Sequence, residues 1–183
     1  MAGFGARTRR GAGGAGVAPE RAASPDAVRE AALKLLERMR RTRFDLARRL
    51  REKGYATAVV EEVLDRLTAV GLVDDVEYAR AFLAGRWGRR AAGWRRLEAE
   101  LRKHGIPAGA IAEARSRLEA QQGGADEVGA ARKALAQAAR RYQNLDPRLR
   151  QQRLYALLVR RGFDGDTIQA ALAQERVAVA NEE

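Results

Sequence analysis

Apolar residues recur at helical spacing along most of the chain, and glycine or proline interrupts the pattern at intervals. After Ser24 and Pro25, the first apolar positions are four residues apart: Ala27, Ala31, Leu35 and Met39. This spacing predicts a helix that buries one stripe of its surface. A serine hydroxyl can cap the first turn, and proline at the first helical position loses no hydrogen bond. We therefore expect a helix to begin at Pro25.

Two further helices are predicted before residue 74. Thr42 can cap the second helix, with Asp45 three residues later, and Gly54 ends it. The third helix begins near Thr57, and its inner face is formed by valine and leucine: Val59, Val60, Val63, Leu64 and Leu67. Residues 24–73 are therefore expected to form one three-helix unit.

One short pattern occurs three times, as LARRLREKGY, LEAELRKHGI and LYALLVRRGF. In each copy leucines stand eight and four residues before a glycine, an apolar residue follows the glycine, and a β-branched residue comes six positions after it. The glycines are Gly54, Gly105 and Gly162. Glycine suits the left-handed conformation at a helix end, and the basic residues before it suit the negative end of the helix dipole. The agreement predicts an all-α fold, a tandem array of three three-helix repeats that forms an elongated, curved molecule.

The same pattern sets the expected boundaries. We expect a flexible basic tail over residues 1–23, repeats over 24–73, 74–122 and 123–176, and a C-terminal tail over 177–183. The N-terminal tail is rich in glycine, alanine and arginine but lacks the apolar core of a secretory signal. This composition fits either a solvated tail with no function or a tail that makes weak electrostatic contacts.

Composition narrows the class of protein. Aromatic residues are only 5% of the chain while alanine and leucine are abundant, which favours helices over strands. The chain has no cysteine, so it can form neither a disulfide nor a thiolate site, and a cytoplasmic location is expected. Its net charge of +11 favours an anionic partner: nucleic acid, a membrane surface or an acidic protein.

Three carboxylates stand close together in the stretch GLVDDVEYARAFLAGR, at Asp74, Asp75 and Glu77. They could hold a metal, form an acid/base pair, or begin a helix. The chain has one histidine and neither an HExxH motif nor a calcium loop. We therefore expect Asp74 to cap a helix and its two neighbours to favour the positive end of the dipole. No catalytic residue, cofactor or metal is expected.

The remaining candidates for chemistry have simpler explanations. His104 stands directly before a glycine, at the position where the other two repeats have lysine and arginine. We therefore expect it to be a helix-terminal residue rather than a general base. The run GAGGAG lacks the lysine and hydroxyl residue of a phosphate loop. Trp87 and Trp94 flank a basic turn; at least one indole is expected in the core, and stacking on a base is the alternative.

Positive charge is spread over all three repeats and is richest in and just before each middle helix. Lysine and arginine outnumber acids by 11 to 8 in residues 24–73, by 10 to 7 in 74–122, and by 10 to 6 in 123–176. If the units stack in register, these helices line one long surface suited to a long anionic partner. Alternatively, the arginines merely solvate the helices. The expected contact surface is the basic set of the second and third repeats: Arg86, Arg89, Arg90, Arg95, Arg96, Arg102, Lys103, Arg148, Arg150, Arg153, Arg160 and Arg161.

Several stretches together resemble one known family. ALKLLERMRRTRFDLARRLREKGYATAVVEEVLDRLTAVGLVDDVEYARAFL resembles the opening half of the bacterial RecX regulators, through its leucine helix, its capped helix ending in Lys-Gly and its Gly-Leu-apolar-Asp-Asp-x-x-Tyr-Ala motif. GWRRLEAELRKHGI and LLVRRGFDGDTIQAAL resemble that family's second and third segments. The resemblance covers residues 27–176. Where the family tends to have Ser-Glu, this chain has Thr42-Arg43, which keeps the cap and inverts one charge.

The resemblance implies a non-enzymatic protein that binds the RecA filament on single-stranded DNA and restrains its strand-exchange, ATPase and co-protease activities. The expected partners are the RecA filament and single-stranded DNA, bound directly or through RecA; no membrane partner is expected, and the protein is expected to be a monomer. The residues themselves leave two other classes open: a sequence-tolerant DNA-binding protein built from helix-turn-helix-like units, and an adaptor with an exposed apolar groove. An enzyme has the least support, because no catalytic residues converge.

Overall fold

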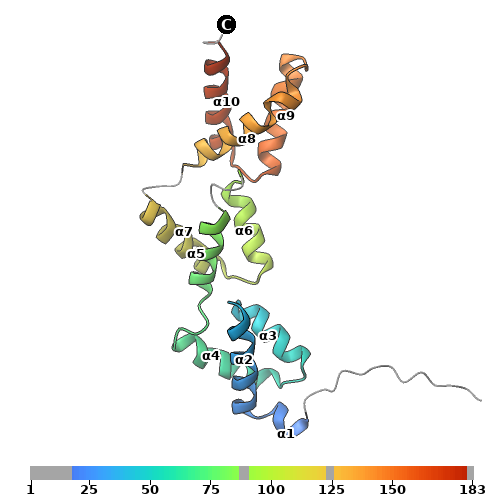
Figure 1. The fold of residues 1–183 in the computed structure, drawn as a ribbon, viewed down its shortest axis with the longest axis vertical. Helices are drawn as coiled ribbons and strands as arrows, with labels where there is room; N and C mark the ends of the chain where they lie inside the picture. The colour runs from blue at the N-terminus through green and yellow to red at the C-terminus, as the bar shows by residue number, and fades with distance from the viewer. Residues whose placement is uncertain (1–17, 87–90, 123–125, 181–183) are drawn as a thin grey trace, which may run out of the picture.

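The computed structural model describes residues 18–86, 91–122 and 126–180, and every regular element in these ranges is an α-helix (Figure 1). The helices are α1 (Pro19–Ala22), α2 (Pro25–Arg38), α3 (Arg43–Glu52), α4 (Thr57–Ala69), α5 (Asp75–Arg86), α6 (Trp94–Lys103), α7 (Ala108–Gln122), α8 (Glu127–Tyr142), α9 (Pro147–Arg160) and α10 (Gly165–Ala180). The predicted all-helical fold is confirmed. None of the helices described is long and apolar enough to cross a membrane.

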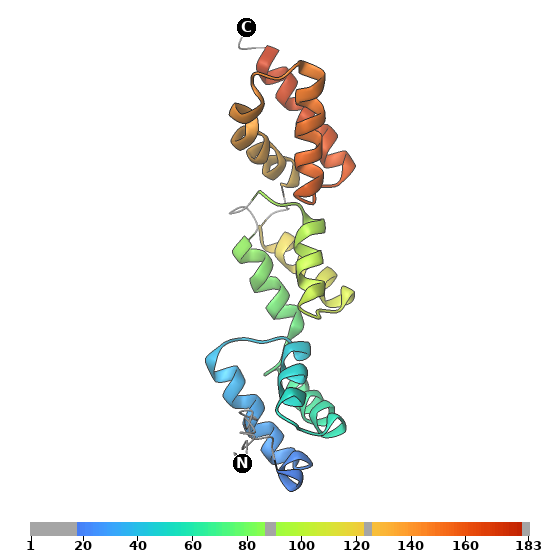
Figure 2. The same ribbon diagram turned by 90° about the vertical axis from the view of Figure 1, so that its right-hand side faces the viewer.

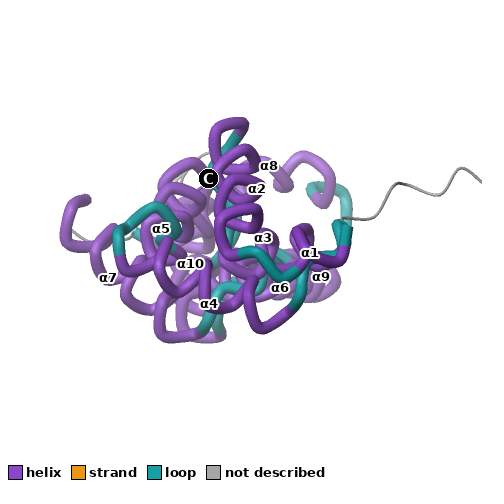
Figure 3. The backbone as a smooth tube through the Cα atoms, turned by 90° about the horizontal axis from the view of Figure 1, so that it is seen from below, coloured by secondary structure: helices purple, strands orange, loops and turns teal. Residues whose placement is uncertain are grey.

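Helices α2–α4, α5–α7 and α8–α10 form three units, here called the first, second and third unit. Each unit has its own buried core: Val28, Leu46, Leu50, Val60 and Leu64 in the first, Leu83, Leu97, Leu101 and Ile111 in the second, and Leu135, Leu158, Phe163 and Ile168 in the third. The units follow one another along the longest axis of the molecule (Figures 1 and 2). When the molecule is viewed from below, along this longest axis, the three units overlap one another (Figure 3). The predicted array of three three-helix repeats is confirmed.

Side chains cap α2 and α5 as the sequence indicates. Ser24 accepts the Ala27 amide at the start of α2 over 3.4 Å. Asp74 accepts the amide of Glu77 over 2.8 Å at the start of α5. Asp74 therefore begins a helix, as predicted, because its carboxylate satisfies an amide that has no partner within the helix.

The three repeated glycines end the three middle helices in the same geometry. Gly54, Gly105 and Gly162 have φ values of 94°, 77° and 86°, the left-handed conformation that favours glycine. In each case the residue after the glycine donates its amide back to the carbonyl of the last leucine, over 3.2 Å: Tyr55 to Leu50, Ile106 to Leu101 and Phe163 to Leu158. This hydrogen bond returns the chain onto the preceding turn and confirms the predicted helix ends.

The stripe predicted for α2 is only partly correct. The residues buried on α2 are Val28, Ala31 and Ala32, and Met39 is 58% exposed. Met39 follows the last helical residue in an extended conformation, with φ −169° and ψ 153°, so helical periodicity no longer decides where its side chain lies. The buried stripe is therefore centred one residue away from the predicted one.

Candidate nucleic-acid interface

The first and second units meet where α3 begins and α6 ends. The hydroxyl of Thr42, the N-cap of α3, donates to the carbonyl of His104 over 2.9 Å and accepts the amide of Asp45 over 3.1 Å. The amide of Arg43, the first residue of α3, donates to the carboxylate of Asp75 over 2.9 Å. The amino end of α3 is thus held by two groups of the next unit.

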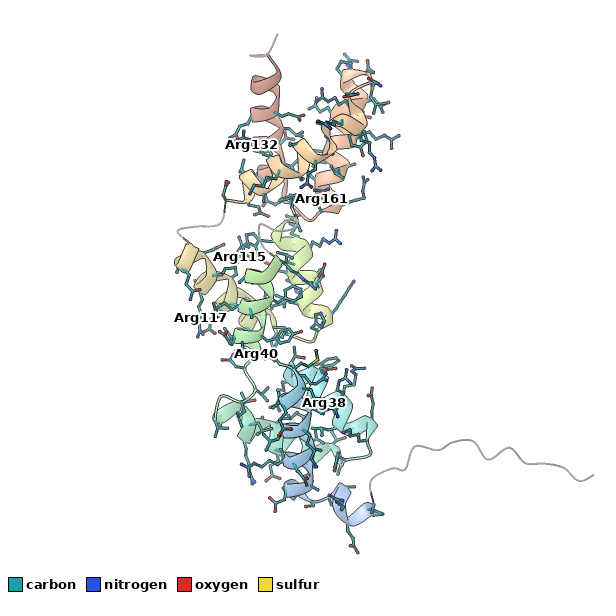
Figure 4. The ribbon with its side chains drawn as sticks, viewed as in Figure 1. Arg38, Arg40, Arg115, Arg117, Arg132 and Arg161 are labelled. Carbon is teal, nitrogen blue, oxygen red and sulfur yellow. The ribbon has the colours of Figure 1, made fainter. Side chains whose placement is uncertain are left out.

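The second and third units meet in the same way. The amide of Gly93, the N-cap of α6, donates to the carbonyl of Arg161 over 2.9 Å, and the amide of Arg95 donates to the carbonyl of Gly162 over 3.2 Å. The amide of Trp94, the first residue of α6, donates to the carboxylate of Glu127 over 3.1 Å. Arg161 marks this junction in Figure 4.

The two junctions align the middle helices end to end. The carboxyl end of α6 abuts the amino end of α3, and the carboxyl end of α9 abuts the amino end of α6 (Figure 2). At each contact the negative end of one helix dipole meets the positive end of the next. The structure therefore brings the three basic helices into one column.

Asp75 and Glu127 occupy equivalent places in this arrangement. Each lies in the first turn of a unit's first helix and accepts the amide at the start of the preceding unit's middle helix. Burial raises the pKa of both carboxyls above the usual range, although the amide that each accepts acts in the opposite direction. Asp75 therefore joins two units, a role beyond the dipole interaction that its position in the sequence suggests. No cluster of three potential metal ligands occurs among the described residues.

The other sequence candidates are placed by the fold. His104 is the C-cap of α6, and its ring lies near those of Tyr78 and Phe82, with centroids 6.2 and 5.9 Å apart. Trp94 is 3% exposed and the Arg115 guanidinium lies 4.6 Å from its ring centroid, so one indole is in the core as expected. Trp87 lies outside the described residues.

Four members of the predicted contact set are ion-paired with glutamates. Arg86 and Arg96 both pair with Glu100, Arg102 pairs with Glu98 over 3.3 Å, and Arg150 pairs with Glu175 over 3.0 Å. The Arg86 guanidinium also lies over the Phe82 ring. Six others make no ion pair within the described part of the chain: Arg95, Lys103, Arg148, Arg153, Arg160 and Arg161. Arg89 and Arg90 lie outside the described residues.

An open groove of about 470 Å³ lies at the junction of the second and third units. Arg95 and Arg96 line it from α6, and Tyr155, Val159 and Arg160 line it from α9. Tyr155 and Val159 are 40% and 50% exposed. Sequence reasoning missed these two residues; the only signal was the tyrosine in LYALLVRR, where the sister repeats have Ala47 and Glu98.

Comparison with known proteins gives the family. Models of the first, second and third three-helix domains of RecX match residues 29–67, 74–114 and 125–172. The regulatory protein RecX of Mycobacterium ulcerans is 36% identical over 153 residues, which cover 81% of this chain and 87% of that protein. The chain belongs to the RecX family. The RecX of Mycobacterium tuberculosis is 35% identical over 167 residues, 86% of this chain and 93% of that protein.

Solved RecX structures have the same fold. The crystal structure of RecX from Lactobacillus salivarius superimposes with a TM-score of 0.74 at 21% identity and covers 84% of this chain and 97% of that one. RecX-family membership confirms the resemblance seen in the sequence. It also confirms that this chain is a regulatory protein rather than an enzyme.

Proposed function

We propose that this RecX-family protein binds the RecA filament on single-stranded DNA in the cytoplasm, as a monomer, and restrains strand exchange, ATP hydrolysis and co-protease activity. The observation that carries the proposal is the column of α3, α6 and α9. A filament offers a long, repeating anionic partner, and a rigid column of basic helices can follow it over many contacts. Hydrogen bonds between the units hold each junction. The column can therefore bind the filament without the entropy cost of ordering the units on binding.

The experiment is a titration of this protein into RecA hydrolysing ATP on single-stranded DNA, beside a measurement of its own binding to the same DNA. We expect hydrolysis to fall at protein concentrations far below those of RecA and of the DNA sites, because one molecule on a filament affects many RecA subunits. Light scattering of the purified protein is expected to give a mass near the monomer's 20.1 kDa. Hydrolysis that falls only once the protein coats enough DNA to exclude RecA would refute the filament regulator.

A second candidate function is sequence-tolerant DNA binding without RecA. The observation that favours it is the set of exposed arginines that make no ion pair in the described part of the third unit, among them Arg148, Arg153 and Arg160. Such a protein would inhibit RecA only by competition for DNA. Adding excess DNA would then relieve the inhibition, whereas a filament regulator would remain inhibitory at a fixed ratio to RecA.

A further inference from the structure

Most basic residues of the first unit form ion pairs with acids of the same unit. Asp45 alone pairs with Arg41, Arg48 and Arg49. On helix α4, Glu61 pairs with Arg43 and Arg51, Asp65 pairs with the same Arg43, and Glu62 pairs with Arg66. Most of the arginines on and around α3 are therefore held in ion pairs, although this unit has a similar excess of basic residues to the others.

The third unit uses its acids differently. Asp126, Asp146 and Asp164 accept backbone amides at the starts of α8, α9 and α10, and Glu127 holds the junction with the second unit. Only one ion pair is formed in the described part of this unit, between Arg150 and Glu175. Its other described basic residues have no carboxylate partner among the described residues: Arg132, Lys133, Arg140, Arg141, Arg148, Arg153, Arg160 and Arg161. Among the described residues, the arginines of the third unit are consequently mostly without ion pairs, whereas those around α3 are mostly ion-paired.

The exposed side of α9 combines these charges with apolar surface. Tyr155 and Val159 are one turn apart, and Arg148 precedes Tyr155 by two turns on the same side of the helix. Leu149 and Arg160 lie about 80–100° further round the helix from Val159 and are also exposed, whereas Arg153, two residues from Tyr155, lies nearly opposite that ring. The side continues into the groove that Arg95 and Arg96 line. We call the following seven residues the α9 face: Arg95, Arg96, Arg148, Leu149, Tyr155, Val159 and Arg160.

We propose that the α9 face binds single-stranded nucleic acid directly, with phosphates on the arginines and a base stacked on Tyr155. Arginines on an open groove bind a phosphate backbone, and an exposed aromatic ring offers a stacking surface to any base. From Arg148 to Arg160 the helix spans about 18 Å, which corresponds to roughly five stacked nucleotides. An acidic protein would match the charge equally well but would leave the ring without a comparable partner. The inference deepens the proposed function by naming the unit that meets DNA.

The experiment measures fluorescence anisotropy of a labelled oligothymidylate with the full-length protein, without RecA, across a salt series. The test variant is Arg148→Gln with Arg160→Gln. The control is Arg48→Gln with Arg51→Gln, which removes the same charge from ion-paired arginines of the first unit. We expect the test variant to lower the steepness of log K against log salt by about 1.4, because each phosphate contact contributes about 0.7. The control should change it much less.

A second pair of variants tests the stacking. Tyr155→Ala should weaken binding roughly 5- to 150-fold, and Tyr155→Phe should bind like the parent, because the ring and not the hydroxyl stacks. All positions changed are exposed or half-exposed on helix surfaces, and circular dichroism checks that each variant keeps its helices. Equal losses from the test and control variants would overturn the proposal, since binding would then follow net charge alone.

The RecA assay separates this proposal from the proposed function. If the test variant binds DNA normally but no longer inhibits RecA, the α9 face contacts protein; the inference fails and the filament regulator stands. If the parent protein does not inhibit RecA below coating concentrations while DNA binding still depends on Arg148, Tyr155 and Arg160, the inference stands and the filament regulator fails.

Discussion

Replacing Gly93 by alanine should open the junction between the second and third units. Gly93 has an ordinary φ of −77°, so alanine meets no backbone strain there. A Cβ at this position would overlap the Gly162 carbonyl and lie 2.5 Å from the Phe163 amide nitrogen. Both neighbours are backbone atoms of the turn that ends α9, and they cannot move aside as a flexible side chain can. Relief of the overlap therefore requires the two units to separate.

The cost follows from the hydrogen bonds that cross the junction. The amides of Gly93, Trp94 and Arg95 donate to the Arg161 carbonyl, the Glu127 carboxylate and the Gly162 carbonyl. At about 1 kcal/mol each, their loss amounts to about 3 kcal/mol of coupling between the units. Because each unit has its own core, the helices themselves should persist. The variant should unfold in separate steps and show a larger, more variable radius of gyration.

Urea unfolding followed by circular dichroism, with small-angle X-ray scattering of the native protein, measures both effects. Gly109→Ala is the matched control, because a Cβ there meets nothing within 4 Å and the residue lies in α7. Because alanine has a higher helix propensity than glycine, Gly109→Ala should leave the stability unchanged or raise it by up to about 1 kcal/mol. If Gly93→Ala unfolds and scatters like the parent, close backbone approach does not hold this junction and the reasoning is wrong.

Three further substitutions test individual contacts. Thr42→Val should lower the unfolding free energy in urea by about 1–2 kcal/mol, because it removes both a helix cap and a hydrogen bond to the second unit. The control is Thr57→Val, at an exposed position without a cap bond, which should change stability by less than about 0.5 kcal/mol. Asp75→Ala should cost about 1–3 kcal/mol by leaving the Arg43 amide unpaired, and Asp75→Asn, which keeps an acceptor oxygen, should cost clearly less; equal costs would contradict the junction role. Burial disfavours ionisation of Asp45, but hydrogen bonds from three arginines outweigh it and lower its pKa from 3.8 to about 2. The folded state thus holds the ionised form, and about 2 kcal/mol of stability present above pH 4 is lost as the pH falls toward 2. The difference in unfolding free energy between the parent and Asp45→Asn should shrink over that range, and a constant difference would show that these ion pairs contribute nothing.

Short-range signals in the sequence were sufficient to predict the helices and the threefold repeat. Gly54, Gly105 and Gly162 each adopt the left-handed conformation expected at a helix end, and Asp74 caps α5 as its neighbours indicate. These features depend on residues within one or two turns, so a pattern in the sequence reports them directly. Met39 was misplaced because a helical stripe was continued beyond the end of its helix.

Whether an arginine is free to bind a partner depends on its ion pairs, and the sequence pattern does not show all of these pairs. Arg102 stands four residues after Glu98, so its ion pair follows from helical spacing. The Arg150–Glu175 pair joins two helices, and no spacing rule predicts it. Gly93 is similar: a glycine with an ordinary φ gives no sign that another backbone lies against it.

The column of middle helices has two different ends, and this difference agrees with the distribution of unpaired charge. At α3 and α6 the first amide of the helix donates to an acid of the following unit. In α9 this position is Pro147, which has no amide hydrogen, and Asp146 caps the next two residues itself. The amino end of α9 therefore carries the positive end of the aligned dipoles beside Arg148, with its own Asp146 as the capping acid in place of an acid from a neighbouring unit. The opposite end of the column belongs to α3, whose arginines are paired with Asp45 and Glu61. Among the described residues, dipole direction and ion pairing thus both favour the proposed nucleic-acid contact at the third unit.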